Sequence, residues 1–172
     1  MLRRHAMLAL TGAAIPLTLR PKRAAAQTTT PLDATAYTDQ TLNVGFFSNT
    51  ISQLALTRSA SVPLRSFAQS EILEQTAIAQ SLTDNLTPPP VPLSAVQQET
   101  VATLQSLSGP QFDNQYITAE IQGHQQLLSF QLGFLQEEDD PTNDLVHIAL
   151  IASAFIETHL LLLNDLGTTG HL

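Results

Sequence analysis

The sequence predicts an all-α protein: a four-helix bundle of two helical hairpins, joined by a Pro-rich crossover and carrying one short extra helix. Three observations support this prediction. Apolar residues recur at three- and four-residue steps over four long stretches, as on the buried face of an amphipathic helix. Alternating strand-like runs are few, and the hairpin dipeptides Asn-Gly and Asp-Gly are absent. Prolines and glycines fall between the stretches, where the chain must turn.

Residues 1–26 have the order of an export signal. A basic start is followed by the apolar run Ala6–Leu19, and three alanines precede Gln27, where we expect cleavage. The Arg3-Arg4 pair resembles a twin-arginine signal, and the general secretory route is the other possibility. An uncleaved membrane anchor is disfavoured because the apolar run is short and contains Gly and Pro. The sequence therefore predicts a periplasmic or otherwise exported protein without a membrane span after signal removal.

The composition limits the chain to one domain and excludes several classes of function. With 172 residues, the chain is long enough to bury a single core. The absence of cysteine excludes disulfides, thiolate metal sites and thiol catalysis. Without residues 1–26, two arginines would face fifteen acids, which is a formal net charge of −13. A surface with this charge repels nucleic acid and anionic membranes, so neither is an expected partner.

The first half of the mature chain is predicted to form one hairpin. Residues 27–36 are expected to be a tether, residues 37–167 the bundle domain, and residues 168–172 a tail. The first two helices are predicted at about Tyr37–Ser59 and Leu64–Leu82, each with an apolar face.

A crossover and a short helix follow the first hairpin. Four prolines force Thr83–Pro92 into an extended path. Ser94 and Gln97 have the spacing of a capping box, which predicts a short helix that ends near Leu107.

The second hairpin is predicted to run from Ser108 to Leu166 around an acidic turn, and Gly167 is expected to end its last helix. Asp140 stands directly before Pro141, so we expect it to be the N-cap of the last helix. The acidic turn lacks the regular ligand spacing of a calcium loop and is interpreted as solvated.

Three polar side chains point into the expected core of this second hairpin. Glu120 and His124 lie between two apolar stripes of its first helix. In its second helix, His159 is expected to share the buried face with Leu145, Ile148, Ala152, Phe155, Leu162, Leu163 and Leu166. Because a buried charge is costly unless it is paired, we expect the three polar side chains to interact.

In an antiparallel hairpin, residues at equal distances from the turn lie opposite each other. This rule places these side chains in one polar layer. In the first hairpin, Ser48 is expected opposite Gln75, with Glu71 one turn away. In the second hairpin, Glu120 is expected opposite His159. The favoured interpretation is a structural hydrogen-bonded layer, because a glutamate between histidines pairs its charge and fixes the helix register.

The same residues also allow two interpretations as a metal site. A mononuclear transition-metal site for zinc, copper or iron would use Glu120, His124 and His159, with Glu71 as a further ligand. A ferritin-type di-iron centre needs four carboxylates and two Glu-x-x-His pairs. The chain has no Glu-x-x-His, so the di-iron centre is the weakest of the three interpretations.

Several segments resemble one known family. They are Leu54-Ala55-Leu56, Leu64-x-x-Phe67-Ala68, Ser108-Gly109-x-x-Phe112-Asp113-x-x-Tyr116, Gly123-His124 and His159-Leu160. Over about residues 37–166, the chain resembles the exported bacterial family known as domain of unknown function 4142. This resemblance implies a ferritin-like helical bundle and assigns no general activity. The chain departs from the family at Ser48, where a glutamate is common, and at Glu74-Gln75, where Asp-His is common.

For function, the sequence predicts a protein without a complete catalytic set. It has neither a Gly-x-Ser-x-Gly turn nor a Gly-rich phosphate loop. The favoured hypothesis is a non-enzymatic periplasmic bundle that binds an unknown protein or envelope component, or resists envelope stress. A metal-binding bundle is the first alternative and a di-iron oxidase the second. The oligomeric state is left open.

Overall fold

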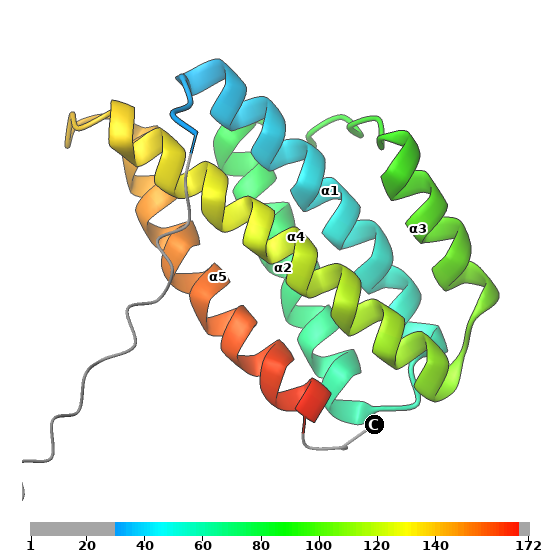
Figure 1. The fold of residues 1–172 in the computed structure, drawn as a ribbon. Coiled ribbons are helices and arrows are strands. Elements are labelled where there is room, and N and C mark those ends of the chain that lie inside the picture. Colours follow the sequence, from blue (N-terminus) through cyan, green and yellow to red (C-terminus); the bar gives the residue numbers. More distant parts are fainter. Residues whose placement is uncertain (1–29, 169–172) are drawn as a thin grey trace, which may run out of the picture.

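The structure is a computed structural model that describes residues 30–168. The predicted export signal and most of the predicted tail lie outside the described residues. Five helices make up the described part of the chain (Figure 1): α1 (Ala34–Arg58), α2 (Val62–Thr83), α3 (Ala95–Ser106), α4 (Gly109–Glu137) and α5 (Asp144–Thr168). No strand is present between residues 30 and 168, so the predicted all-α helical bundle is confirmed.

The four long helices pack as two hairpins, and α3 is the short extra helix. α1 packs along α2, and α4 packs along α5. The hairpins are joined mainly by the contact between α1 and α4, whereas α2 and α5 touch over a smaller area. α3 lies on one side of the bundle and α5 at the opposite edge (Figure 1).

α1 and α5 each begin three residues away from the predicted position, and α2 begins two residues before it. α1 begins before Tyr37, because the Asp33 carboxylate accepts a hydrogen bond from the first turn (2.8 Å) and caps the helix. α5 begins at Asp144, so the prediction of Asp140 as its N-cap is wrong. The Asp140 carboxylate instead accepts hydrogen bonds from the backbone N–H and the hydroxyl of Thr142, both 2.8 Å long. These bonds stabilise a separate turn before the helix.

The predicted capping box of α3 is present and also attaches this helix to the bundle. The Ser94 backbone N–H donates to the Gln97 side chain (2.8 Å), and the Gln97 backbone N–H donates to the Ser94 hydroxyl (3.3 Å). The Gln97 amide also donates to Asn43 of α1 (2.9 Å). The short helix is therefore held at its first turn.

The core consists of three apolar clusters stacked along the bundle. One lies where α1 ends and α4 begins and includes Phe112 and Tyr116. A middle cluster includes Leu127 and Ile156, and the cluster at the other end contains a stacked aromatic pair, Tyr37 and Phe134. The polar side chains of the bundle interior lie mainly between the first cluster and the middle cluster.

The buried face of α5 is narrower than predicted. Its buried residues are Val146, Ala149, Ala152, Ile156, His159 and Leu163. Phe155 and Leu162, predicted to share this face, are 48% and 49% exposed. Apolar residues occupy both the buried face and the opposite, exposed face of this helix, so hydrophobic periodicity alone does not select the side that packs on α4.

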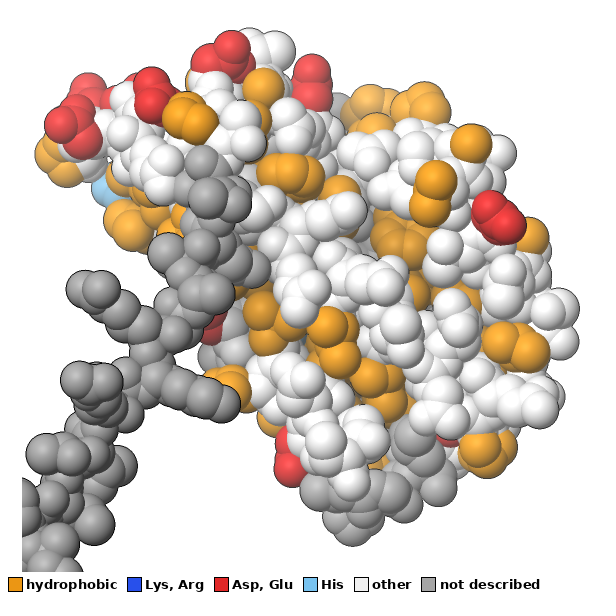
Figure 2. Space-filling view, in the orientation of Figure 1, with side chains coloured by type: hydrophobic (Ala, Val, Ile, Leu, Met, Phe, Trp, Pro, Cys, Tyr) orange, Lys and Arg blue, Asp and Glu red, His pale blue; other side chains and the backbone are white. Residues whose placement is uncertain are grey.

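No Lys or Arg side chain is visible on the face drawn in Figure 2, although the described residues include Arg58 and Arg65. Acidic side chains gather near the turn between α4 and α5. Within the described part of the chain, α5 is the one helix that is long and apolar enough to cross a membrane, judged by length and composition alone.

Candidate metal centre

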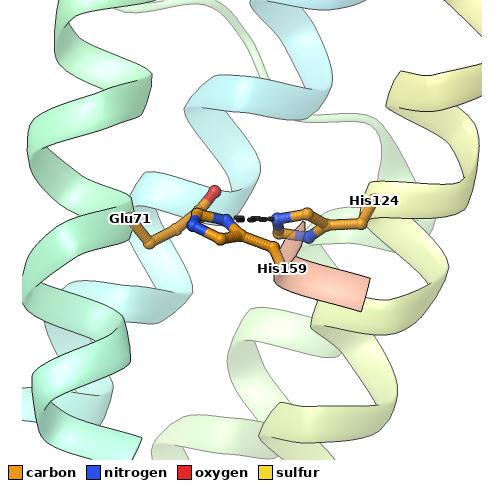
Figure 3. A group of neighbouring side chains, drawn as sticks. All are labelled: Glu71, His124 and His159. Atoms are coloured by element: carbon orange, nitrogen blue, oxygen red, sulfur yellow. Dashed lines mark hydrogen bonds and ion pairs between the residues drawn. The ribbon is translucent and has the colours of Figure 1, made fainter. Parts of the chain in front are cut away.

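Three ligand-type side chains from three helices converge inside the bundle (Figure 3): Glu71 of α2, His124 of α4 and His159 of α5. His159 Nδ1 lies 2.9 Å from Glu71 Oε2 and 3.1 Å from His124 Nε2. His124 Nε2 lies 3.4 Å from the same Glu71 oxygen. All three side chains are buried. We call this group the Glu71/His124/His159 triangle.

The sides of the triangle match the spacing of ligand atoms around a metal ion. With metal–ligand bonds of about 2.0–2.1 Å, neighbouring ligand atoms lie about 3.3 Å apart in tetrahedral coordination. They lie about 2.9 Å apart in octahedral coordination at the same bond length. The triangle therefore has the size that a first-row transition metal requires.

Each imidazole is oriented by a partner on its outer nitrogen. His124 Nδ1 lies 2.8 Å from the backbone carbonyl of Glu120, an acceptor, so this nitrogen carries a proton and donates it. His159 Nε2 lies 3.5 Å from the Glu74 carboxylate. Outer partners of these two types are the usual second neighbours of metal-binding histidines, because they turn the remaining nitrogen toward the ion.

The two oxygens of Glu71 have different surroundings. Oε1 accepts hydrogen bonds from the Ser48 hydroxyl (2.8 Å) and the Gln75 amide (2.9 Å). Oε2 is buried and accepts no hydrogen bond from the described residues, although both imidazoles lie beside it. Burial raises the pKa of Glu71, but His124 and His159 outweigh this effect and hold its pKa well below the usual range. Glu71 is therefore a carboxylate with one oxygen directed at the imidazoles.

Glu120 belongs to an adjoining hydrogen-bond network rather than to the triangle. Its two oxygens lie 2.7 Å from the Ser48 hydroxyl and 2.9 Å from the Ser52 hydroxyl. Tyr116 lies 2.8 Å from Ser52, whose single proton is directed to Glu120, so the tyrosine is the donor between these two. The network thus connects α1 and α4 behind the triangle.

Ser48 has one hydroxyl proton and lies between two carboxyl groups. Its contacts with Glu71 and Glu120 can both be hydrogen bonds only if one carboxyl is protonated. Burial and the charge of Glu71 raise the pKa of Glu120 to about 7, against the opposing effects of His124 and the two serines. Below neutral pH, Glu120 is therefore mainly protonated and donates to Ser48, and Ser48 donates to Glu71.

His124 is a cation in the metal-free protein at neutral pH. Burial lowers its pKa, but Glu71 and Glu120 together raise the pKa to about 9. A metal ion that binds His124 Nε2 must therefore displace a proton.

A surface cavity lies near the triangle but does not reach it. It has a volume of about 210 Å³ and lies between α1, α2 and the Pro-rich crossover, where Gly45, Gln75 and Pro88 line it. Gln75 separates the cavity from Glu71. On another side, the ring of Phe67 packs against His159, with the ring centres 5.0 Å apart.

The structure brings together three of the four residues predicted as metal ligands, Glu71, His124 and His159, and places the fourth, Glu120, behind them. Ser48 was expected to lie opposite Gln75, but its hydroxyl donates to Glu71. Along the bundle axis, α2 therefore lies one helical turn away from its predicted position relative to α1. Sequence reasoning missed Ser52, which the four-residue spacing from Ser48 places on the same helix face.

Comparison with known proteins gives one match. No curated protein and no solved structure matches the chain. A family model matches residues 19–163, a range that contains every residue of the triangle and of the adjoining network. The chain belongs to the family described as Domain of unknown function (DUF4142).

Proposed function

We propose that this protein is an exported metal-binding helical bundle, in which Glu71, His124 and His159 hold one divalent transition-metal ion. One observation carries the proposal: three ligand atoms from three helices lie 2.9–3.4 Å apart. The outer nitrogens of both imidazoles support it, since one faces a backbone carbonyl and the other a carboxylate.

The donor set limits the class of metal. Two imidazoles and one carboxylate suit zinc, copper or iron rather than calcium or magnesium, which prefer oxygen ligands. Three protein ligands leave at least one coordination position for water or a small ligand. The cavity ends at Gln75, so a ligand that enters there reaches the ion only if the Gln75 side chain moves.

A structural polar layer is the second candidate, and the charges of the site favour it. Glu71 is ionised and His124 is protonated in the metal-free protein, so the layer neutralises itself without an ion. In that case the bundle acts through a partner or in envelope stress, as the sequence alone favoured, and the layer fixes the helix register.

Metal binding by the untagged protein separates the two candidates. The protein is stripped with chelator and its thermal unfolding is measured with added zinc, copper or ferrous iron. We expect at least one of these ions to raise the melting temperature, because an ion that binds only the folded state stabilises it. Calorimetric titration should give one ion per chain.

Three variants and one control locate the ion. His124→Ala, His159→Ala and Glu71→Gln should each abolish the metal-dependent rise in melting temperature. His147→Ala removes an exposed histidine of α5 and should leave the rise unchanged. A wild-type melting temperature indifferent to all three metals would reject the metal site and leave the structural layer.

A further inference from the structure

The outward face of α5 is apolar. Large hydrophobic side chains on this face are strongly exposed, among them Leu150 (54%), Ile151 (56%) and Leu161 (74%). Phe155 and Leu162 complete the set. At about 100° per residue, all five fall within one stripe that lies opposite the buried face of the helix. We call them the α5 stripe.

The α5 stripe has no covering element among residues 30–168. α5 packs on α4 and, over a smaller area, on α2, and both contacts use its other face. Soluble monomers rarely expose a large contiguous apolar surface, and where one occurs it usually marks an interaction site. α5 contains no Lys or Arg, so the stripe has no cation with which to bind an anionic lipid surface.

Four of the five residues of the α5 stripe are symmetric about position 156, and Phe155 is the exception because its counterpart is Glu157. Leu150 and Leu162 stand six residues to either side of this position, and Ile151 and Leu161 stand five residues to either side. If two copies of α5 cross in antiparallel fashion about a two-fold axis at Ile156, each leucine or isoleucine meets an apolar residue of the other copy.

One pair of ionisable residues at the ends of the α5 stripe follows the same symmetry. His147 and Asp165 stand nine residues to either side of Ile156, and both lie on the line through the middle of the stripe. The antiparallel arrangement therefore places His147 of one copy opposite Asp165 of the other, an imidazole against a carboxylate, at both ends of the contact.

We propose that a second copy of this chain docks on the α5 stripe and forms an antiparallel, two-fold α5–α5 dimer. From His147 to Asp165 the contact would be about 27 Å long. A single pair of helices buries less than the roughly 800 Å² per partner of a standard interface, so the dimer dissociates on dilution. His159 faces the opposite side of α5, so the dimer does not depend on the metal site.

Sedimentation velocity over a range of concentrations tests the dimer, on protein recovered after expression of the full-length chain. We expect a monomer–dimer equilibrium in wild type. The double variant Ile151→Gln/Leu161→Gln should raise the dissociation constant at least about tenfold, since each pair of apolar contacts is lost twice per dimer. Val96→Gln is the matched control: Val96 is 74% exposed on α3, at the other side of the bundle, and should leave the constant unchanged.

Charge reversal tests the antiparallel register. His147→Glu places two carboxylates opposite each other at both ends and should weaken the dimer. His147→Glu/Asp165→Lys places a carboxylate opposite an ammonium group at both ends and should recover the dimer. A chain that is monomeric at every concentration, a dimer that Ile151→Gln/Leu161→Gln leaves intact, or weakening by Val96→Gln to the same degree would overturn the proposal. So would failure of the charge pair to recover the dimer, or binding of the α5 stripe to neutral phosphatidylcholine vesicles in place of self-association.

Discussion

A protonated Glu120 has nearly the same hydrogen-bonding groups as a glutamine: a donor on one side and an acceptor oxygen on the other. In the metal-free protein below neutral pH, Glu120→Gln can therefore donate to Ser48 and accept from Ser52 as the wild type does. We expect this variant to retain most of the free energy of unfolding at pH 5. Glu120→Leu leaves both serines without their partner and should cost about 1–3 kcal/mol. Urea unfolding of both variants in chelator checks the comparison.

The same carboxyl predicts a pH dependence. The pKa of Glu120 is about 7 in the folded protein, above its ordinary value of 4.5. A carboxyl whose pKa is raised in the folded state stabilises the fold in its protonated form. This stabilisation is fully present below the unfolded pKa and is lost as the pH rises through the folded pKa. Between pH 4.5 and 8, wild type should lose up to about 3 kcal/mol relative to Glu120→Gln. The free energy of unfolding of both proteins is measured against pH. If the two curves run parallel, Glu120 is already ionised at pH 5 and the prediction is wrong.

The inward position of single polar residues could be predicted from the sequence, but their pairing could not. Helical periodicity placed Glu120, His124 and His159 inside, and all three are buried. Which carboxylate contacts the imidazoles depends on the position of α2 along the bundle axis relative to α5. A shift of one helical turn is enough to exchange one carboxylate for another. That level is set by packing between residues far apart in the chain, for which one sequence offers no spacing rule. Glu71 therefore took the place expected for Glu120.

At the scale of helices, two buried glycines allow a matched comparison. A Cβ on Gly45 of α1 would collide with the side-chain oxygen of Gln75, whereas a Cβ on Gly123 of α4 would meet only Val44 at 3.7 Å. Alanine is about 1 kcal/mol more favourable than glycine inside a helix. Gly123→Ala should therefore stabilise the protein by about 0.5–1 kcal/mol.

Gly45→Ala should act on the metal site instead. It displaces the Gln75 amide, which donates to Glu71 Oε1, and a lost outer partner typically weakens metal binding about 10–100-fold. Calorimetric titration of Gly45→Ala and Gly123→Ala with zinc measures the difference. If the two variants bind zinc equally well, Gln75 does not position Glu71.

The helices themselves were predictable because apolar spacing, prolines and capping residues are local signals. The capping box of α3 is an example, since both of its hydrogen bonds lie within four residues. The first residue of α5 could not be predicted, because Asp140 and Asn143 each accept a backbone hydrogen bond in the same turn. Which of the two caps the helix depends on how the hairpin closes. The exposed side of α5 was missed for a related reason: when two opposite faces of a helix are both apolar, the sequence pattern does not tell which of them packs on the bundle.

At the scale of the whole molecule, the metal site and the protonation of the bundle are linked. The metal binds the neutral form of His124, whose pKa is about 9 in the metal-free protein. Below pH 9, each fall of one pH unit reduces the neutral fraction about tenfold. Zinc affinity should therefore rise about tenfold per pH unit between pH 6 and pH 8. Titration in two buffers of different ionisation enthalpy should show release of about one proton per ion, and a pH-independent affinity would contradict the protonated His124.

X-ray absorption spectroscopy of the protein loaded with one equivalent of zinc tests the metal centre most directly. We expect nitrogen and oxygen ligands at about 2.0–2.1 Å with the multiple-scattering signal of two imidazoles. In His159→Ala, one imidazole should disappear from the spectrum, whereas in His147→Ala both should remain. A zinc spectrum with fewer than two imidazoles in wild type, or one that His159→Ala leaves unchanged, would contradict a metal held by Glu71, His124 and His159.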